Sequence, residues 1–417
     1  MAFSEAAGKD YFRAWTYRAE RRAAVCPAFI FSNRMRLFVF SGASGSAVPV
    51  YFSYSFTSKV PGDMVPAFFS KAMILFNCDY SEGAHADILR RMAETNMEQT
   101  AGYGEDPYCD QARKLIAGLC GRPDLDIHFL IGGTQTNFTV IAAALRPHQC
   151  VLCAETGHIN VHESGAVEAC GHKVSAIPSP DGKLTARQID EAWHAHWDDE
   201  TREHMPQPRM VYISQPTELG TIYSREELQE ISGVCRLRGL YLYMDGARLG
   251  YGLCAEDNDL DLPEIASLCD AFYIGGTKVG ALFGEALVLR HESLKEDFRY
   301  IVKQRGGRLA KGRLLGIQFL ELFRDGLYFR LGAHADRLAV MLRDFCRSRG
   351  LALPFSSGTN QQFVTMPDYV LDELRKKYGF AYLRREDETH STVRFCTSWA
   401  TREEDVRELM ADIARLC

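Results

Sequence analysis

The chain has 417 residues, of which 46% are hydrophobic and 24% are charged, and its formal net charge is −6. These values are typical of soluble proteins that bury one large core, or a large and a small one. The sequence has no basic block that would indicate a nucleic-acid partner. It also has no run of about eighteen apolar residues that would indicate a transmembrane helix. The thirteen cysteines are scattered, many of them in apolar runs. This fits free thiols in a reducing compartment better than a disulfide framework.

Residues 1–72 differ from the rest of the chain, because they are poor in acidic residues and show no sustained period. We expect a poorly ordered extension without a catalytic function. Two other interpretations stay open: a transit-like segment, or an upstream stretch that precedes a true start at Met73. The expected location is the cytoplasm, with the mitochondrion as the alternative if the extension acts as a transit segment.

From Met73 onward, short apolar runs alternate with helical periods, which predicts a mainly parallel sheet covered on both faces. The predicted strands are 127–131, 150–154, 173–177, 210–214, 240–244, 271–274 and 286–289. A capping box of Ser224 and Glu227 begins one of the intervening helices. Cys150 and Cys153 form a C-x-x-C pair, but they lie in a predicted strand and no second pair follows, so we expect no metal site.

After about residue 322 the pattern changes. A long amphipathic helix, which carries Leu338 and Leu342, is followed by predicted strands and helices in mixed order. They are strands 362–366, 380–383 and 393–397, a helix over 369–378, and a final helix capped by Thr401. The sequence thus predicts an extension (1–72), a large domain (73–322) and a small C-terminal α+β domain (323–417).

Two residues at strand ends carry the functional interpretation. Strand 240–244 ends at Asp245, at the edge where open α/β sheets bind ligands. The next run ends in a glycine turn that presents Lys278. Pyridoxal phosphate (PLP) chemistry requires such a pair, since the lysine forms a Schiff base with the cofactor aldehyde and the carboxylate keeps the pyridine nitrogen protonated. The simpler alternative is that Asp245 pairs with Arg248 while Lys278 extends into solvent.

Two further strand ends carry suitable groups. Gly133 and Thr134 begin a helix directly after a strand, where backbone N–H groups and a hydroxyl make an anion site. The surrounding glycines match neither a dinucleotide loop nor a nucleoside-triphosphate loop. His158 follows the next strand, and its imidazole could stack on a flat cofactor ring or act as an acid or base near neutral pH. For His162 we expect a structural role.

Five motifs together resemble the threonine aldolase/β-eliminating lyase family, which has PLP fold type I, over about residues 73–417. They are Tyr103-Gly104-Glu105-Asp106-Pro107, Gly132-Gly133-Thr134 with Asn137, His158-Ile159, Asp245-Gly246-Ala247-Arg248-Leu249 and Gly275-Gly276-Thr277-Lys278. The resemblance implies that Lys278 is the Schiff-base lysine, that Asp245 faces the pyridine nitrogen, and that His158 stacks on the ring.

The resemblance also assigns residues around the cofactor. It implies that Gly133 and Thr134 bind the phosphate and that Arg248 lies beside the cofactor. Arg394 would bind the substrate carboxylate, for which a guanidinium is well suited.

Family members are dimers or tetramers with shared sites, so the resemblance implies a homo-oligomer in which a neighbour contributes Tyr103 and Arg313. Three departures from the family pattern concern the substrate. Cys78 stands where the family usually has a serine that helps to hold the substrate carboxylate, so the donor becomes a weaker thiol. The lysine motif reads Thr-Lys-Val-Gly instead of Ser-Lys-Gly, and the residues 214–218 replace a Glu-Asn-Thr-His stretch.

The implied activity is retro-aldol cleavage of L-threonine or L-allo-threonine to glycine and acetaldehyde, a step of threonine catabolism and glycine biosynthesis. The alternatives are an aminotransferase or a β-eliminating lyase acting on a small amino acid. A non-catalytic PLP-binding or structural oligomer is a third possibility, against which the complete set of Asp245, Lys278, His158 and Arg394 argues.

Overall fold

The computed structural model describes residues 37–40, 47–50 and 73–417. The chain divides into two units, one ending at Ser70 and one spanning Lys71–Cys417. In the first unit, β1 (Leu37–Phe40) pairs antiparallel with β2 (Ala47–Val50). The expected poorly ordered extension, residues 1–72, lies outside the described residues apart from these two strands. All the predicted site residues belong to the second unit.

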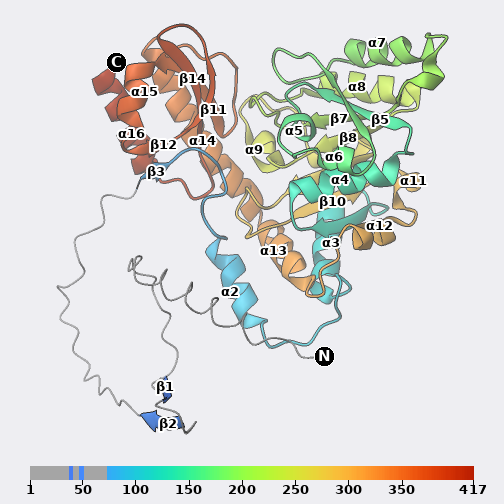
Figure 1. Cartoon of the computed structure of the whole chain (residues 1–417), viewed down its shortest axis with the longest axis horizontal. Helices are drawn as coiled ribbons and strands as arrows, with labels where there is room; N and C mark the ends of the chain where they lie inside the picture. The colour runs from blue at the N-terminus through green and yellow to red at the C-terminus, as the bar shows by residue number, and fades with distance from the viewer. Residues whose placement is uncertain (1–36, 41–46, 51–72) are drawn as a thin grey trace, which may run out of the picture. The chain divides into compact units, whose positions relative to one another are not determined.

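The second unit contains a seven-stranded sheet with the order β4-β10-β9-β8-β7-β5-β6 (Figure 1). All neighbouring strands are parallel except β10, which runs antiparallel to both β4 and β9. The strands are β4 (Asp126–Leu130), β5 (Gln149–Ala154), β6 (Lys173–Ile177), β7 (Gln207–Ser214), β8 (Tyr241–Asp245), β9 (Ala271–Gly275) and β10 (Glu285–Leu289). The predicted seven strands and the mainly parallel sheet are confirmed.

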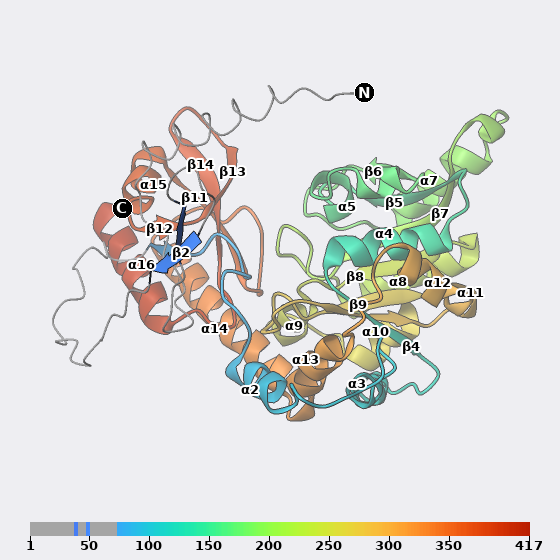
Figure 2. The same cartoon turned by 60° about the horizontal axis from the view of Figure 1, so that its bottom comes forward.

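Both faces of this sheet are covered, which explains why its strands read as continuous apolar runs. In β7, Val211 and Ile213 join one buried cluster while Met210 and Tyr212 join the other. On the first face pack α2 (Ala86–Glu94), α3 (Pro107–Leu119), α7 (Ala186–Trp197), α8 (Arg225–Arg238), α9 (Leu249–Cys254), α10 (Leu262–Leu268) and α13 (Arg313–Arg324). On the second face pack α4 (Gly133–Ala144), α5 (His158–Val161), α6 (Ala166–Ala169), α11 (Glu292–Lys295) and α12 (Phe298–Gln304). Figures 1 and 2 both show α13 beside α3. A short 3₁₀ turn, η1 (Arg202–His204), precedes β7.

A second, three-stranded sheet forms the C-terminal part, drawn in orange and red in Figure 1. Its order is β11 (Gln361–Pro367), β14 (His390–Cys396) and β13 (Ala381–Arg385), packed with α14 (Leu327–Ser348), α15 (Asp368–Leu374) and α16 (Glu403–Leu416). The short β3 (Ile74–Leu75) pairs with β12 (Tyr378–Gly379), and Phe76 is buried in the same core. Residues 74–76 therefore lie with the C-terminal part, while the division of the chain at residue 322 stays a prediction.

Two predicted helix starts have different outcomes. The capping box of Ser224 and Glu227 is confirmed at the start of α8. Thr401 does not cap α16, which follows Arg402 without a side-chain cap; the Thr401 hydroxyl accepts the backbone N–H of Ser398 at 2.7 Å instead. Three acidic residues in the first turn of α16 stabilise that end of the helix through its dipole. Within the described part of the chain, no helix is long and apolar enough to span a bilayer.

Candidate active site

Asp245, the last residue of β8, is the centre of a buried hydrogen-bond network and is only 4% exposed. The hydroxyl of Tyr212 donates to its Oδ2 at 2.6 Å, and the hydroxyl of Tyr273 donates to its Oδ1 at 2.5 Å. Asn137 Nδ2 donates to Oδ2 at 3.0 Å, and the backbone N–H of Ala247 donates to Oδ1 at 3.0 Å. Four donors thus fix the orientation of this carboxylate.

The same network keeps Asp245 ionised. Burial by itself raises the pKa of the carboxyl, but the charge of His158 and the hydrogen bonds from Tyr212 and Tyr273 outweigh it and hold the pKa below its usual value. Burial and the nearby Asp245 charge raise the pKa values of both tyrosines well above 10. The hydroxyls therefore stay protonated as donors, and the site presents a fixed negative charge.

The network continues to His158, which lies at the start of α5. Asn137 Nδ2 also donates to Oε1 of the buried Glu163 at 2.7 Å, and His158 Nδ1 lies 2.8 Å from the same oxygen. With a carboxylate as its acceptor, Nδ1 carries the proton, which leaves Nε2 as the basic atom of the neutral ring. Burial lowers the pKa of His158, but the hydrogen bond with Glu163 and the charge of Asp245 raise it above the usual value.

Lys278 lies on the turn after β9, next to the turn that follows Asp245. The two turns are joined by the hydrogen bond from Gly275 N to Gly246 O, 2.9 Å long. The Tyr251 hydroxyl donates to the Lys278 carbonyl at 2.5 Å, while Lys278 Nζ makes no hydrogen bond within the described residues. Burial and the charge of Arg248 lower the pKa of the amine, although the charges of Asp79, Asp245 and Glu285 raise it. A lowered pKa favours the nucleophilic free amine.

Arg248 binds a different carboxylate from the one that the simpler alternative requires. Its Nε and Nη2 donate to Oδ2 and Oδ1 of Asp79 at 2.7 and 3.1 Å. Asn360 Nδ2 adds a third bond to Asp79 at 2.9 Å. Burial raises the pKa of Asp79, but the charges of Arg248 and Lys278 lower it to about 2. The alternative in which Arg248 neutralises Asp245 is therefore wrong, and the charge of Arg248 acts on Lys278.

Arg394 and Cys78 lie on the side of the site formed by the C-terminal sheet. Arg394 Nη1 donates to Gln361 Oε1 and Nη2 donates to the carbonyl of Asn77, each at 3.0 Å. Its buried Nε has no partner among the residues that the structure describes, so a donor is left over for another ligand. Cys78 Sγ lies 3.2 Å from Ser81 Oγ. Because Asn77 precedes Cys78 in the chain, the thiol and the guanidinium belong to one edge of the site.

The start of α4 lies against the Asp245 network. A Cβ atom added to Gly133 would stand 3.0 Å from the Tyr273 hydroxyl, so a glycine permits this close approach. In the described part of the chain, no side chain caps this helix, and a Cβ on the preceding Gly132 would meet no atom within 4 Å. The first-turn N–H groups and Thr134 thus form an open anion site. An uncapped helix start, a fixed carboxylate and a partly buried lysine fit the phosphate, ring nitrogen and aldehyde of PLP.

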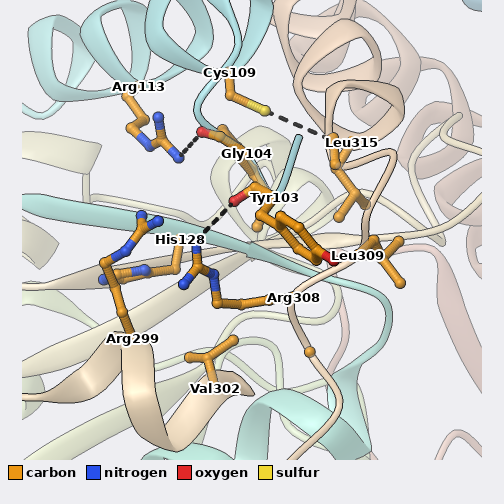
Figure 3. A pocket seen from close by; sticks show the side chains of 13 residues that line it. Tyr103, Gly104, Cys109, Arg113, His128, Arg299, Val302, Arg308, Leu309 and Leu315 are labelled. Carbon is orange, nitrogen blue, oxygen red and sulfur yellow. Dashed lines mark hydrogen bonds between the residues drawn. The ribbon is translucent and has the colours of Figure 1, made fainter. Parts of the chain in front are cut away.

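Tyr103 and Arg313 lie outside this cluster. Figure 3 shows Tyr103 in a separate pocket, where its carbonyl accepts Arg308 at 3.5 Å. Tyr103 is 45% exposed, and its ring lies under Lys303, whose Nζ is 4.5 Å from the ring centre. Arg313 donates to the backbone carbonyls of three residues after α2, namely Thr95, Asn96 and Glu98. The single chain thus brings together eight of the ten predicted site residues and leaves these two apart.

Sequence reasoning missed the groups that orient Asp245 and His158. Tyr212 and Tyr273 stand inside apolar strands and read as core, and Glu163 reads as a loop acid. A signal was present, because a tyrosine in a strand buried on both faces needs a partner for its hydroxyl. No group of three or more His, Cys, Asp or Glu in the described part of the chain could hold a metal ion. Cys150 and Cys153 lie as free, buried thiols in β5.

A buried acid, a partly buried lysine and an uncapped helix start at one edge of a mainly parallel sheet define a PLP-dependent enzyme of fold type I. The chain belongs to the β-eliminating lyase family, which it matches over residues 78–368. It is 34% identical over 347 residues to the low specificity L-threonine aldolase of a Pseudomonas species, covering 81% of this chain and 96% of that protein. It is 26% identical to the low specificity L-threonine aldolase of Saccharomyces cerevisiae, covering 70% of this chain and 75% of that protein.

Solved structures agree with this placement. A Leishmania major threonine aldolase is 45% identical, with a TM-score of 0.80 over 82% of this chain and 99% of the other. An aspartate aminotransferase from Thermus thermophilus shares the fold at 15% identity, with a TM-score of 0.61 over 83% of this chain and 92% of the other.

Proposed function

We propose that this chain is a PLP-dependent aldolase that cleaves L-threonine or L-allo-threonine to glycine and acetaldehyde. The observation that carries the proposal is its similarity to threonine aldolases over almost their whole length, including 45% identity to the Leishmania major protein. The aminotransferase neighbours are too distant in sequence to support transamination, because their likeness is one of fold alone.

The residues present fit the cofactor. Lys278 would hold it covalently, Asp245 would face its ring nitrogen, and the start of α4 with Thr134 would hold its phosphate. When bound, PLP supplies an electron-accepting ring that stabilises the charge left on Cα as the Cα–Cβ bond breaks. Asp245 supports this role because its network keeps the carboxylate ionised and oriented.

Arg394 holds the substrate by its carboxylate. Two of its nitrogens are fixed by Gln361 and the Asn77 carbonyl, so the guanidinium is oriented before a substrate arrives. Its unpartnered Nε supplies a charge-assisted donor. Cys78, on the same edge, adds a weaker donor. A fixed carboxylate determines how the Cα–Cβ bond is directed, which is the positioning that the cleavage requires.

His158 takes the proton of the β-hydroxyl as the bond breaks. Nδ1 is bound to Glu163, so Nε2 is the atom that accepts this proton, directly or through a water molecule. The charge that forms on the ring is stabilised by Glu163 and Asp245, the same groups that raise its pKa. The same imidazole would stack on the cofactor ring, as the family resemblance implies.

We further propose a homo-oligomer, dimer or tetramer, in which Tyr103 and Arg313 serve the site of a neighbour. Their distance from the Asp245 cluster of their own chain supports this assignment, since the family resemblance gives both a role in the site. We propose a cytoplasmic location and a role in glycine biosynthesis and threonine catabolism. Buried free thiols in the described part of the chain support a reducing compartment.

The activity can be tested in a single sample. The absorption spectrum of the purified protein is recorded before and after addition of L-threonine, and acetaldehyde is measured in the same sample. We expect a yellow protein whose band changes on addition of substrate, with acetaldehyde and glycine formed in equal amounts. A keto acid without acetaldehyde or free ammonia would show an aminotransferase, and a keto acid together with ammonia would show a β-eliminating lyase. A colourless protein would contradict any PLP-dependent role.

A further inference from the structure

Glu285 is a buried acid at the active-site edge for which the proposed reaction has no role. It is the first residue of β10 and only 4% exposed. In the sheet it stands opposite Gly275 of β9 on one side and Leu130 of β4 on the other. A carboxyl in such a position needs partners, because burying it without them is costly.

Its partners are the two residues that precede Lys278. The backbone N–H of Gly276 donates to Oε2 at 3.0 Å, and the hydroxyl of Thr277 donates to Oε1 at 2.8 Å. Both carboxyl oxygens are therefore bound to the turn that carries the lysine. The Thr277 hydroxyl also accepts the backbone N–H of Gly284 at 2.9 Å, which closes the loop from both ends. These two hydrogen bonds explain why the lysine motif has a threonine at position 277.

The carboxyl of Glu285 also interacts electrostatically with Lys278. Burial raises the pKa of Glu285 to about 8, although the hydrogen bond from Thr277 and the charge of Lys278 lower it. An ionised Glu285 in turn favours the protonated form of the Lys278 amine. The other titratable groups that face it are Asp245, whose charge acts in the same direction as burial, and the buried tyrosines Tyr243, Tyr273 and Tyr328, whose hydroxyls stay protonated.

We propose that Glu285 is a positioning residue for Lys278: it clamps the Gly276–Thr277 turn with both carboxyl oxygens, and in its ionised form it helps to retain the proton on the Lys278 nitrogen. The two parts of the role are separable. Glutamine at position 285 can accept the Gly276 N–H with its amide oxygen and donate to the Thr277 hydroxyl with its amide nitrogen, but it loses the charge, whereas alanine loses the clamp as well. The inference rests on the proposed function only in requiring that PLP binds to Lys278.

The test is a pH titration of the absorption band of the holoenzyme between pH 6 and 10, because the pH of the band change reports the proton on the Lys278 nitrogen. Wild type, Glu285→Gln and Glu285→Ala are compared, together with retention of PLP during gel filtration. Glu321→Gln is the control, since Glu321 is a largely buried glutamate on α13 that pairs with Arg91 and Arg324 away from the site.

We expect Glu285→Gln to retain PLP as wild type does and to move the midpoint about one pH unit toward acid. Glu285→Ala should show a similar shift and lose PLP faster, and the control should match wild type in both measurements. If Glu285→Gln and wild type behave alike, whether with the same midpoint or with no band change, the charge coupling is refuted. If Glu285→Ala retains PLP as wild type does, the clamp is refuted.

This measurement is independent of turnover. A wild-type protein that shows the band but forms no acetaldehyde from L-threonine would contradict the proposed activity and leave the Glu285 result valid. A wild-type protein that binds no PLP would contradict both.

Discussion

The two sides of the active site are built differently. Around Asp245, each carboxyl oxygen has two donors, and the tyrosines that bind it belong to β7 and β9, the strands on either side of β8. On the other side, within the described residues, Lys278 Nζ makes no hydrogen bond and Arg394 Nε is buried without a partner. We call the first the Asp245 side and the second the Lys278–Arg394 side.

The difference follows from what each side has to do. Groups that set the charge around a bound ring should be fixed in advance, because preorganised dipoles need no rearrangement during the reaction. Groups that bind an incoming ligand must keep donors in reserve, since an unmade hydrogen bond is costly only until the ligand arrives. Changes on the Asp245 side should therefore alter kcat and pH dependence. On the Lys278–Arg394 side, loss of Lys278 should remove the covalent hold on PLP, and with it kcat, whereas changes at Arg394 should alter KM.

The largest effect is expected for Lys278→Ala, which removes the lysine proposed to hold PLP covalently. We expect kcat to fall by at least about 10³-fold. Reduction with borohydride followed by mass spectrometry should find the PLP-modified peptide in wild type and not in the variant. Lys183→Ala, in which a lysine that pairs with Glu227 is removed, should behave as wild type. A covalent adduct on another lysine would refute the assignment.

Asp245→Asn should cost about 10²- to 10³-fold in kcat, because the side chain keeps its shape and loses the fixed negative charge. KM for threonine should change much less, since the substrate carboxylate is held on the other side. Steady-state kinetics with saturating PLP measures both. An equal loss in Asp245→Asn and in a matched Asp270→Asn variant, at the buried acid that binds Arg290, would show that only stability had changed.

Arg394→Lys should raise KM for L-threonine about 10- to 100-fold and leave kcat within a few-fold, because an ammonium cannot reproduce the fixed guanidinium fork. Initial rates over a wide threonine range give both constants. Arg384→Lys, at an exposed arginine on β13 that pairs with Glu386, is the matched control. A variant with unchanged KM would remove Arg394 from the substrate site.

Glu163→Gln should shift the pH profile by about one unit. The pKa of His158 is raised above 6.5, so the neutral base is lost as the pH falls through that raised value, and kcat/KM should decline on the acid side above pH 6.5. Glutamine removes the charge that contributes to this raised pKa, so the acid limb should move toward lower pH. An acid limb that stays in place would exclude His158 as the base.

The smallest effect is expected for Cys78→Ser, which restores the hydroxyl that family members usually have. A hydroxyl is a better donor than a thiol, so KM for threonine should fall about threefold with kcat unchanged. An unchanged or higher KM would show that Cys78 does not contact the substrate. Ser81→Ala, which removes the group beside the thiol, tests whether that contact matters.

The sequence by itself determined the sheet and the reactive pair. Seven apolar runs gave seven strands because a sheet covered on both faces requires uninterrupted hydrophobic segments, a property that is local in the chain. Asp245 and Lys278 were found for the same reason, since a polar residue that ends an apolar run marks the ligand-binding edge. The cap at Thr401 was predicted wrongly because several nearby residues can begin a helix and local patterns do not choose between them.

Only the tertiary structure decided which groups act on which. Glu163 is 26 residues from Asn137 and Tyr273 is 28 from Asp245, yet their contacts orient the histidine and the acid. Arg248, only three residues from Asp245, pairs instead with Asp79, which is 169 residues away. Hydrogen-bond partners depend on where strands and loops meet in space, and neither composition nor period encodes that meeting. The identity of the cofactor could thus be predicted from the chain, whereas the network that tunes its site could not.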